Sequence, residues 1–160
     1  MTDTLRSICD QCTYLKNPRL DFIPAELGRC REILLRDLQE LVVAATANNE
    51  KSVVILAGII LEGILYAFVS AQTDYIAGRR GSFEFNPDHS LQNYLNIFNR
   101  WLNDLMPAVT LPDLIVSYRD LVHMNQELKR PPGTCASAAR EMLRILDTFL
   151  EALSEFPIPT

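Results

Sequence analysis

The sequence predicts an all-α fold: a single bundle of about five helices around a buried apolar central helix. Apolar residues recur every three to four positions over long segments, which is the period of a helix with one face turned toward a core. The sequence lacks the sustained alternation of a half-buried strand, and it contains no Asn-Gly or Asp-Gly hairpin turn. We therefore expect more than half of the residues to be helical, without a β-sheet.

Length and composition indicate one domain. The chain has 160 residues, 48% of them hydrophobic, which is enough for a core without disulfides or metal. We expect a single domain over residues 1–160 with its core at about 25–153. The net charge of −5 argues against a general nucleic-acid coat, which binds by neutralising phosphates, but it permits a small basic site. The first residues lack the layout of a secretory signal, so a cytoplasmic protein is expected.

The first part of the chain predicts two amphipathic helices. A short helix covers residues 3–15 and ends near Pro18. The next begins at Pro24, because proline suits the first turn of a helix, where its missing N–H costs nothing. It ends at Asn48-Asn49.

Residues 53–69 predict the central helix. The segment contains a single charge, Glu62, in seventeen residues. A membrane span is the alternative, but seventeen helical residues measure only about 25 Å against a hydrocarbon core of about 30 Å. A carboxylate near the middle adds about 2.5–3.5 kcal/mol against insertion. We therefore expect no membrane association and a core helix covered on all sides, with residues 55–65 as the most buried helix.

The second half predicts three further helices separated by loops rich in glycine and proline. They cover residues 91–103, 111–128 and 134–153. Ser90 is suited to cap the first of them, and Thr134 the last, because their hydroxyl oxygens accept hydrogen bonds from free backbone N–H groups. Pro131 stops the middle one.

The cysteines do not predict a metal or redox site. Cys9 and Cys12 form a C-x-x-C, but a structural zinc site needs a second pair of ligands. The remaining cysteines and both histidines are scattered singly along the chain. Two cysteines at helical spacing are better explained as small residues packed inward. We expect free thiols, no metal and no cofactor.

A few other residues are candidates for contact with RNA. Arg79 and Arg80 lie in the expected 78–90 loop, and together with Arg130 they form a weak candidate set for RNA-phosphate contact. Solvated surface arginines are the favoured alternative. His89 should be exposed and without a special role. Trp101 is expected in the core or an interface rather than as a base-stacking platform, because the acidic balance provides no electrostatic funnel.

Arg119 and His123 are the most informative pair in the chain. They stand four positions apart in the helix expected at 111–128, so a continuous helix places both on one face, about 5–6 Å apart at Cβ. A permanent cation beside a titratable imidazole suits cleavage of an RNA phosphodiester, because one group holds the phosphate charge and the other moves a proton.

Glu62 is the expected third member of this cluster. A carboxylate inside an apolar helix is costly unless it is paired, so we expect Glu62 within ion-pair or hydrogen-bond reach of Arg119 or His123. Two interpretations stay open. The cluster is either a structural tie between two core helices, or a site in which a buried acid orients a catalytic imidazole.

The cluster and its setting resemble the HEPN superfamily, whose signature is Arg, then a polar residue, then His. Arg119, Asp120 and His123 supply these residues. The order of segments is also similar: an apolar helix with LEGILY, a Leu-rich helix, YRDLVH, a turn broken by prolines and a last amphipathic helix. The similarity covers about residues 25–153. The spacing between Arg119 and His123 is one residue shorter than the ribonuclease-type signature.

The resemblance implies a metal-independent endoribonuclease of toxin or defence type that acts as a homodimer. His123 would transfer the proton and Arg119 would grip the scissile phosphate. The homodimer would form through the apolar surface of one or two helices related by a twofold axis. The alternative is a non-catalytic module that dimerises or binds a protein partner, with Glu62, Arg119 and His123 as a structural polar cluster. An enzyme needs Arg119 and His123 open to a cleft, whereas a structural cluster needs them covered.

Overall fold

The computed structural model describes residues 3–121 and 123–156. The chain is 73% helical, without a strand in the described ranges, which confirms the all-α prediction. In chain order the helices are α1 (Leu5–Gln11), α2 (Thr13–Lys16), the 3₁₀ turn η1 (Ala25–Leu27), α3 (Gly28–Thr46), α4 (Glu50–Ala71), α5 (Thr73–Arg80), α6 (Leu91–Ile97), the π turn η2 (Phe98–Leu102), the 3₁₀ turn η3 (Asn103–Leu105), α7 (Leu114–Asp120), α8 (Met124–Leu128) and α9 (Thr134–Ser154).

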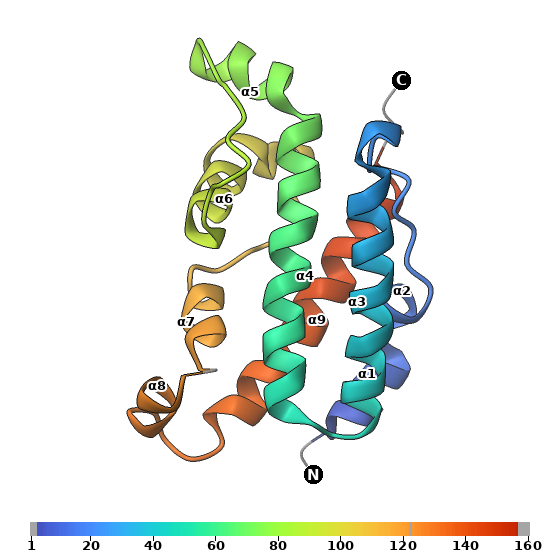
Figure 1. The fold of residues 1–160 in the computed structure, drawn as a ribbon, viewed down its shortest axis with the longest axis vertical. Helices are drawn as coiled ribbons and strands as arrows, with labels where there is room; N and C mark the ends of the chain where they lie inside the picture. Colours follow the sequence, from blue (N-terminus) through green and yellow to red (C-terminus); the bar gives the residue numbers. More distant parts are fainter. Residues whose placement is uncertain (1–2, 122, 157–160) are drawn as a thin grey trace.

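The long helices α3, α4 and α9 form the body of the bundle, as Figure 1 shows, with α1 and α2 on one side and α5 to α8 on the other. The main packing partners of α4 are α3 and α9. Eleven residues of α4 are buried, more than in any other described helix, as expected for the apolar segment. The side chain of Asn49 caps its first turn by accepting a hydrogen bond from the backbone N–H of Ser52.

The expectation that α4 is covered on all sides is wrong. Ile55 is 37% exposed and Ile59 is 47% exposed, so one face of the helix is open. The open face lies between α3 on one side and α6 and α7 on the other (Figure 1). The physical reason is that an apolar sequence shows which side chains avoid water but not whether enough neighbours exist to cover them.

Helix α4 also has the length and hydropathy of a membrane span. The most apolar window of eighteen residues has a mean hydropathy of 2.3, and 61% of that window is buried inside the bundle. This burial agrees with a core helix packed against α3 and α9.

The first predicted helix, at 3–15, is divided at Cys12 into α1 and α2. Cys9 and Cys12 are buried free thiols, as expected for inward-packed residues. Burial in the apolar core raises the pKa of Cys12 to about 12, which keeps this thiol protonated and poorly nucleophilic at neutral pH. Pro24 precedes the short turn η1, so that α3 begins four residues later, at Gly28.

The second half of the chain departs further from the predicted boundaries. The expected 78–90 loop begins later, because α5 continues to Arg80 and ends where Gly81 adopts a φ of 96°. The helix expected at 91–103 widens into the π turn η2 and ends in η3. The helix expected at 111–128 is divided into α7 and α8. The last helix, α9, covers the predicted range, but the expected cap by Thr134 is wrong: the N-cap is Gly133, with a φ of 85°, and Thr134 is the first residue of the helix. The Thr134 hydroxyl donates a hydrogen bond to the carbonyl oxygen of Pro131 instead.

Candidate functional site

Arg119 lies in the last turn of α7, a short helix that packs against α4 and α9. Its side chain crosses α4 at Gly58, where an added Cβ would lie 3.5 Å from the Cγ of Arg119. A Cβ at this position would make only an ordinary van der Waals contact, so the aliphatic part of Arg119 packs on the surface of α4 without requiring a glycine there. One turn further along α4 is Glu62.

Glu62 and Arg119 form an ion pair. The Arg119 Nη1 atom lies 3.1 Å from Glu62 Oε2, which confirms the expectation that Glu62 lies within reach of one of the two motif residues. The expectation that the carboxylate is sealed in the core is wrong, since the side chain of Glu62 is 32% exposed and that of Arg119 is 45% exposed. The pair spans α4 and α7 at the open face, where water still reaches both charges.

His123 does not share a helix with Arg119. α7 ends at Asp120, and His123 has an extended backbone with φ −87° and ψ 124° immediately before α8. The argument from i,i+4 spacing on a continuous helix is therefore wrong for this pair. His123 is exposed, and its carbonyl oxygen accepts hydrogen bonds from the N–H groups of Gln126 and Glu127 in the first turn of α8. Within residues 3–121 and 123–156, no hydrogen bond or ion pair joins His123 to Glu62 or Arg119.

The charges around this site are balanced rather than positive. Arg119 is paired with Glu62, and Lys51 Nζ at the start of α4 lies 3.0 Å from Glu127 Oε2 of α8. Each of these cations therefore has its own carboxylate. A phosphate that binds here has to compete with these carboxylates for the cations.

Tyr118 connects α7 to α9. Its hydroxyl donates a short hydrogen bond to Glu141 Oε2, and both side chains are only partly exposed. Burial, followed by the hydrogen bond to Glu141, raises the pKa of Tyr118 to about 12. The phenol therefore stays protonated at neutral pH and can hold α7 to α9 as a donor.

The three arginines expected to contact RNA phosphate do not gather in one place. Arg79 and Arg80 lie in the last turn of α5 at one end of the bundle, whereas Arg130 follows α8 at the other end (Figure 1). Arg79 is also engaged, since its Nη1 atom lies 2.6 Å from Asp104 Oδ2 and donates to the hydroxyl of Tyr75. The hydrogen bond and charge of Asp104 raise the pKa of Arg79. Arg80 has no ion pair among the described residues.

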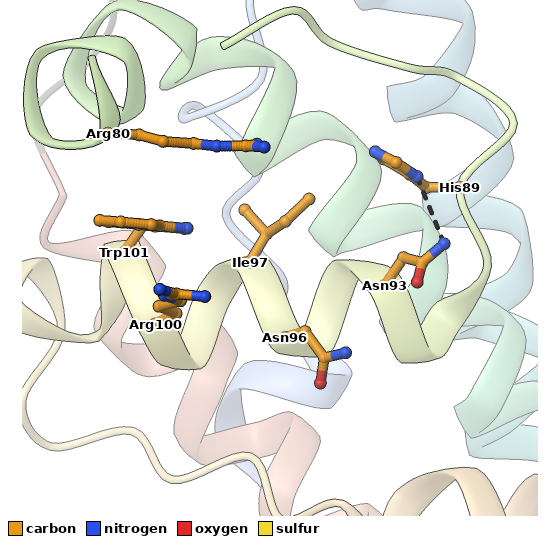
Figure 2. Close-up of a pocket in the computed structure, with 7 residues that line it drawn as sticks. All are labelled: Arg80, His89, Asn93, Asn96, Ile97, Arg100 and Trp101. Atoms are coloured by element: carbon orange, nitrogen blue, oxygen red, sulfur yellow. Dashed lines mark hydrogen bonds between the residues drawn. The ribbon is translucent and has the colours of Figure 1, made fainter. Parts of the chain in front are cut away.

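Arg80 belongs instead to a cavity that sequence reasoning missed. The cavity has a volume of about 570 Å³ and lies between the end of α5 and the outer face of α6 and η2. Figure 2 shows its lining side chains, which are Arg80, His89, Asn93, Asn96, Ile97, Arg100 and Trp101.

The predictions from the sequence for two of these residues, His89 and Trp101, differ from the structure. His89 was expected to have no special role, and Trp101 was expected in the core or an interface; both are half-buried at this cavity. A signal for the site was present, because the segment from His89 to Leu102 has polar residues at helical spacing and not one carboxylate. It was masked by the net negative charge of the whole chain.

Comparison of the chain with protein-family models, with curated proteins and with solved structures gave no match. The resemblance to HEPN domains rests on the motif and on the order of segments in the sequence.

Proposed function

We propose that the chain is a HEPN-like helical domain that cleaves RNA without a metal ion and acts as a homodimer, with Glu62, Arg119 and His123 at its active site. The observation that supports this is the open position of all three residues. Arg119 and Glu62 are 45% and 32% exposed at the side chain, and His123 is exposed. A cluster whose only role is to tie two core helices together is expected to be covered.

Each residue has a distinct chemical role in this proposal. The guanidinium of Arg119 can hold the phosphate with two parallel hydrogen bonds. An imidazole can accept or donate a proton, so His123 takes the proton of the attacking 2′-hydroxyl or gives one to the departing 5′-oxygen. Glu62 acts as a positioning residue for Arg119, since it contacts the guanidinium and has no bond to His123 among the described residues.

The homodimer is supported by the apolar side chains exposed on α3 and α4. They are Ile33, Val43, Ile55 and Ile59. A contact between copies through the open face of α4 would cover part of this surface and bring Arg119 of one protomer toward the corresponding residue of the other. Two guanidiniums beside one cleft would make the local charge more favourable for RNA than one paired arginine does.

A second candidate function is a non-catalytic dimerisation or interaction module. It is favoured by the ion pair itself, because Glu62 already neutralises Arg119 at 3.1 Å. In that case the exposed apolar face of α3 and α4 is the functional surface, and the ion pair helps to set the position of α7 on α4.

Cleavage of mixed-sequence RNA in the presence of EDTA tests the proposal. We expect the wild type to cleave, and His123→Ala to reduce the rate by about 10²–10⁴-fold, because it removes the proton-transfer group. Arg119→Ala should also abolish cleavage. Both variants should keep their melting temperature, since both side chains are exposed. Arg6→Ala is the matched control, because Arg6 is an exposed arginine on α1 that forms no ion pair among the described residues.

Two outcomes contradict the ribonuclease proposal. One is an inactive wild type, and the other is cleavage that survives both Arg119→Ala and His123→Ala, which indicates a contaminating nuclease. Sedimentation equilibrium on the same samples tests the oligomer. A dimer without cleavage supports the interaction module, and a monomer at micromolar concentration excludes both candidates in their dimeric form.

A further inference from the structure

The cavity between α5, α6 and η2 has the character of an anion site in a chain that is acidic overall. Two arginines, Arg80 and Arg100, and the imidazole of His89 line it, and none of the carboxylates in the described part of the chain does. The net charge of the chain is −5, so this local excess of cations is not an average property of the surface. Guanidinium groups facing a cavity without a carboxylate partner are suited to bind a phosphate.

The two adjacent arginines at the end of α5 differ in their partners: one forms an ion pair within the protein and the other lines the cavity. Arg79 is used within the protein, with its Nη1 atom 2.6 Å from Asp104 Oδ2. Arg80 lines the cavity and has no ion pair among the described residues. Arg100 likewise lacks a carboxylate partner in the described ranges, and its guanidinium carbon lies 4.9 Å from the centre of the Trp101 ring.

The floor of the cavity offers a flat aromatic surface. Trp101 and Arg100 both lie in η2, where the helix widens into a π turn at Phe98–Leu102. Single π turns inside helices are rare and occur frequently at functional sites. Figure 2 shows the side chain of Arg80 on one side of the indole of Trp101 and that of Arg100 on the other, and all three residues line the cavity. Arg100 covers one face of the indole, so a planar base can stack on the other face, the one turned toward Arg80.

The remaining polar groups of the cavity are of the kind that reads a heterocycle. Asn93 and Asn96 of α6 also line the cavity, and a carboxamide offers both a donor and an acceptor, as the edge of a nucleobase does. Figure 2 shows the side chain of Asn93 turned toward His89 and that of Asn96 turned away from it. Asn93 Nδ2 lies 3.4 Å from His89 Nδ1, so the two side chains are already placed next to each other. The volume of about 570 Å³ lies in the range of small-molecule sites.

We propose that this cavity binds a nucleoside phosphate, with the base stacked on Trp101, the phosphate held by Arg80 and Arg100, and the base edge contacted by Asn93 and Asn96. The phosphate comes from a free nucleotide or from the 5′ end of an RNA chain. The site is built from α5, α6 and η2, whereas the proposed active site is built from α4, α7 and the residue before α8. The inference therefore stands whether or not the chain cleaves RNA.

Trp101 provides a direct readout, because it is the only tryptophan in the chain. We expect adenosine 5′-monophosphate and uridine 5′-monophosphate to quench its fluorescence in a saturable way, with excitation at the red edge of the indole band to avoid absorption by the bases. Calorimetry on the same samples gives the dissociation constant independently. Adenosine and inorganic phosphate, titrated separately, should each bind at least tenfold more weakly than adenosine monophosphate, because each lacks one half of the contacts.

Three variants of equal size change test the roles of the arginines. Arg80→Gln and Arg100→Gln should each weaken binding of adenosine monophosphate by about tenfold to a hundredfold, the usual cost of losing a hydrogen bond to a charged group. Arg79→Gln is the matched control, since it removes one charge from the neighbouring position without touching the cavity, and its affinity should stay within a factor of about two. All three arginines are exposed, so the fold should be retained, which circular dichroism checks.

Several results overturn the inference. Absence of saturable quenching and of binding heat with either nucleotide is one. Binding of inorganic phosphate or adenosine as tight as that of the nucleotide is another, and so is an equal loss of affinity in Arg79→Gln and Arg80→Gln. A short RNA with a 5′-phosphate, compared with the same RNA ending in a 5′-hydroxyl, separates the two sources. Tighter binding of the phosphorylated RNA than of the free nucleotide supports the RNA end as ligand, and the reverse order supports a free nucleotide.

Discussion

Two pairs of helices in this bundle are held in different ways. α4 and α9 bury continuous apolar stripes and pack against each other along the centre. α7 buries a single residue, Ile115, with Leu121 buried just beyond its end, and α8 buries none of its described residues. This difference in burial indicates that the long helices provide most of the stability, whereas Arg119 and His123 lie in the least buried part of the fold.

Polar contacts supplement the limited apolar packing of the short helices. Tyr118 of α7 donates to Glu141 of α9, and Lys51 pairs with Glu127 of α8. An exposed ion pair contributes about 0–1 kcal/mol, whereas a fully buried leucine contributes about 1.5–3 kcal/mol. The segment with α7 and α8 should therefore open locally at a lower free energy than α4 and α9.

The largest expected effect compares a leucine from each region. Leu146 of α9 is fully buried, whereas Leu128 of α8 is 77% exposed. Leu146→Ala should lower the free energy of unfolding by about 2–5 kcal/mol, because it leaves a cavity in the core. Leu128→Ala should change it by less than about 0.5 kcal/mol. Urea denaturation measures both, and similar losses in the two variants would show that α8 is held as firmly as α9.

Two glycines of α4 allow the packing of α4 on α3 to be compared with its packing on α7. An added Cβ at Gly63 would lie 2.8 Å from Leu34 Cδ2 of α3, whereas one at Gly58 would lie 3.5 Å from Arg119 Cγ of α7. Gly58→Ala should therefore be neutral or stabilising by up to about 1 kcal/mol, from helix propensity. Gly63→Ala gains the same propensity, but overpacking against the buried Leu34 should offset it by about 1–3 kcal/mol.

Thermal melts of the two glycine variants provide the measurement. We expect Gly58→Ala to have a higher melting temperature than Gly63→Ala. The reverse order would mean that α4 meets α7 more tightly than it meets α3.

The smallest expected effect concerns the bond between α7 and α9. Tyr118→Phe should cost about 1 kcal/mol at neutral pH, the usual net value of one hydrogen bond. The pKa of Tyr118 is raised from 10.0 to about 12, so the unfolded chain loses this proton first as the pH rises. The stabilisation is complete below pH 10.0 and is lost as the pH approaches about 12.

The gap in stability between the wild type and Tyr118→Phe should thus narrow over that alkaline range. Denaturation curves at a series of pH values measure it. Leu146→Ala is the control from the core, because neither leucine nor alanine titrates, so its gap in stability to the wild type should stay constant over this range. A gap that stays constant with pH for Tyr118→Phe would show that the bond to Glu141 does not favour the protonated phenol.

The all-α class and the long helices could be predicted from the amino-acid sequence. α4 and α9 have stripes of apolar residues that run over several turns, so the sum of many burial terms outweighs any local uncertainty. The approach of Glu62 to Arg119 was also predictable, because an apolar helix with one carboxylate needs a cation nearby. These features depend on composition and period, which the sequence carries directly.

The ends of the helices and the faces that stay exposed became known only from the tertiary structure. The break between α7 and α8 is marked by the extended ψ of His123, which no periodic pattern reports. Glu62 is partly open to water because none of the described helices covers that face of α4. Trp101 faces a cavity because the chain widens into the π turn η2 and α5 ends beside it. Periodicity tells which side of a helix is apolar, but the neighbours that cover it come from distant segments and from loop directions, and those depend on the packing of the whole chain.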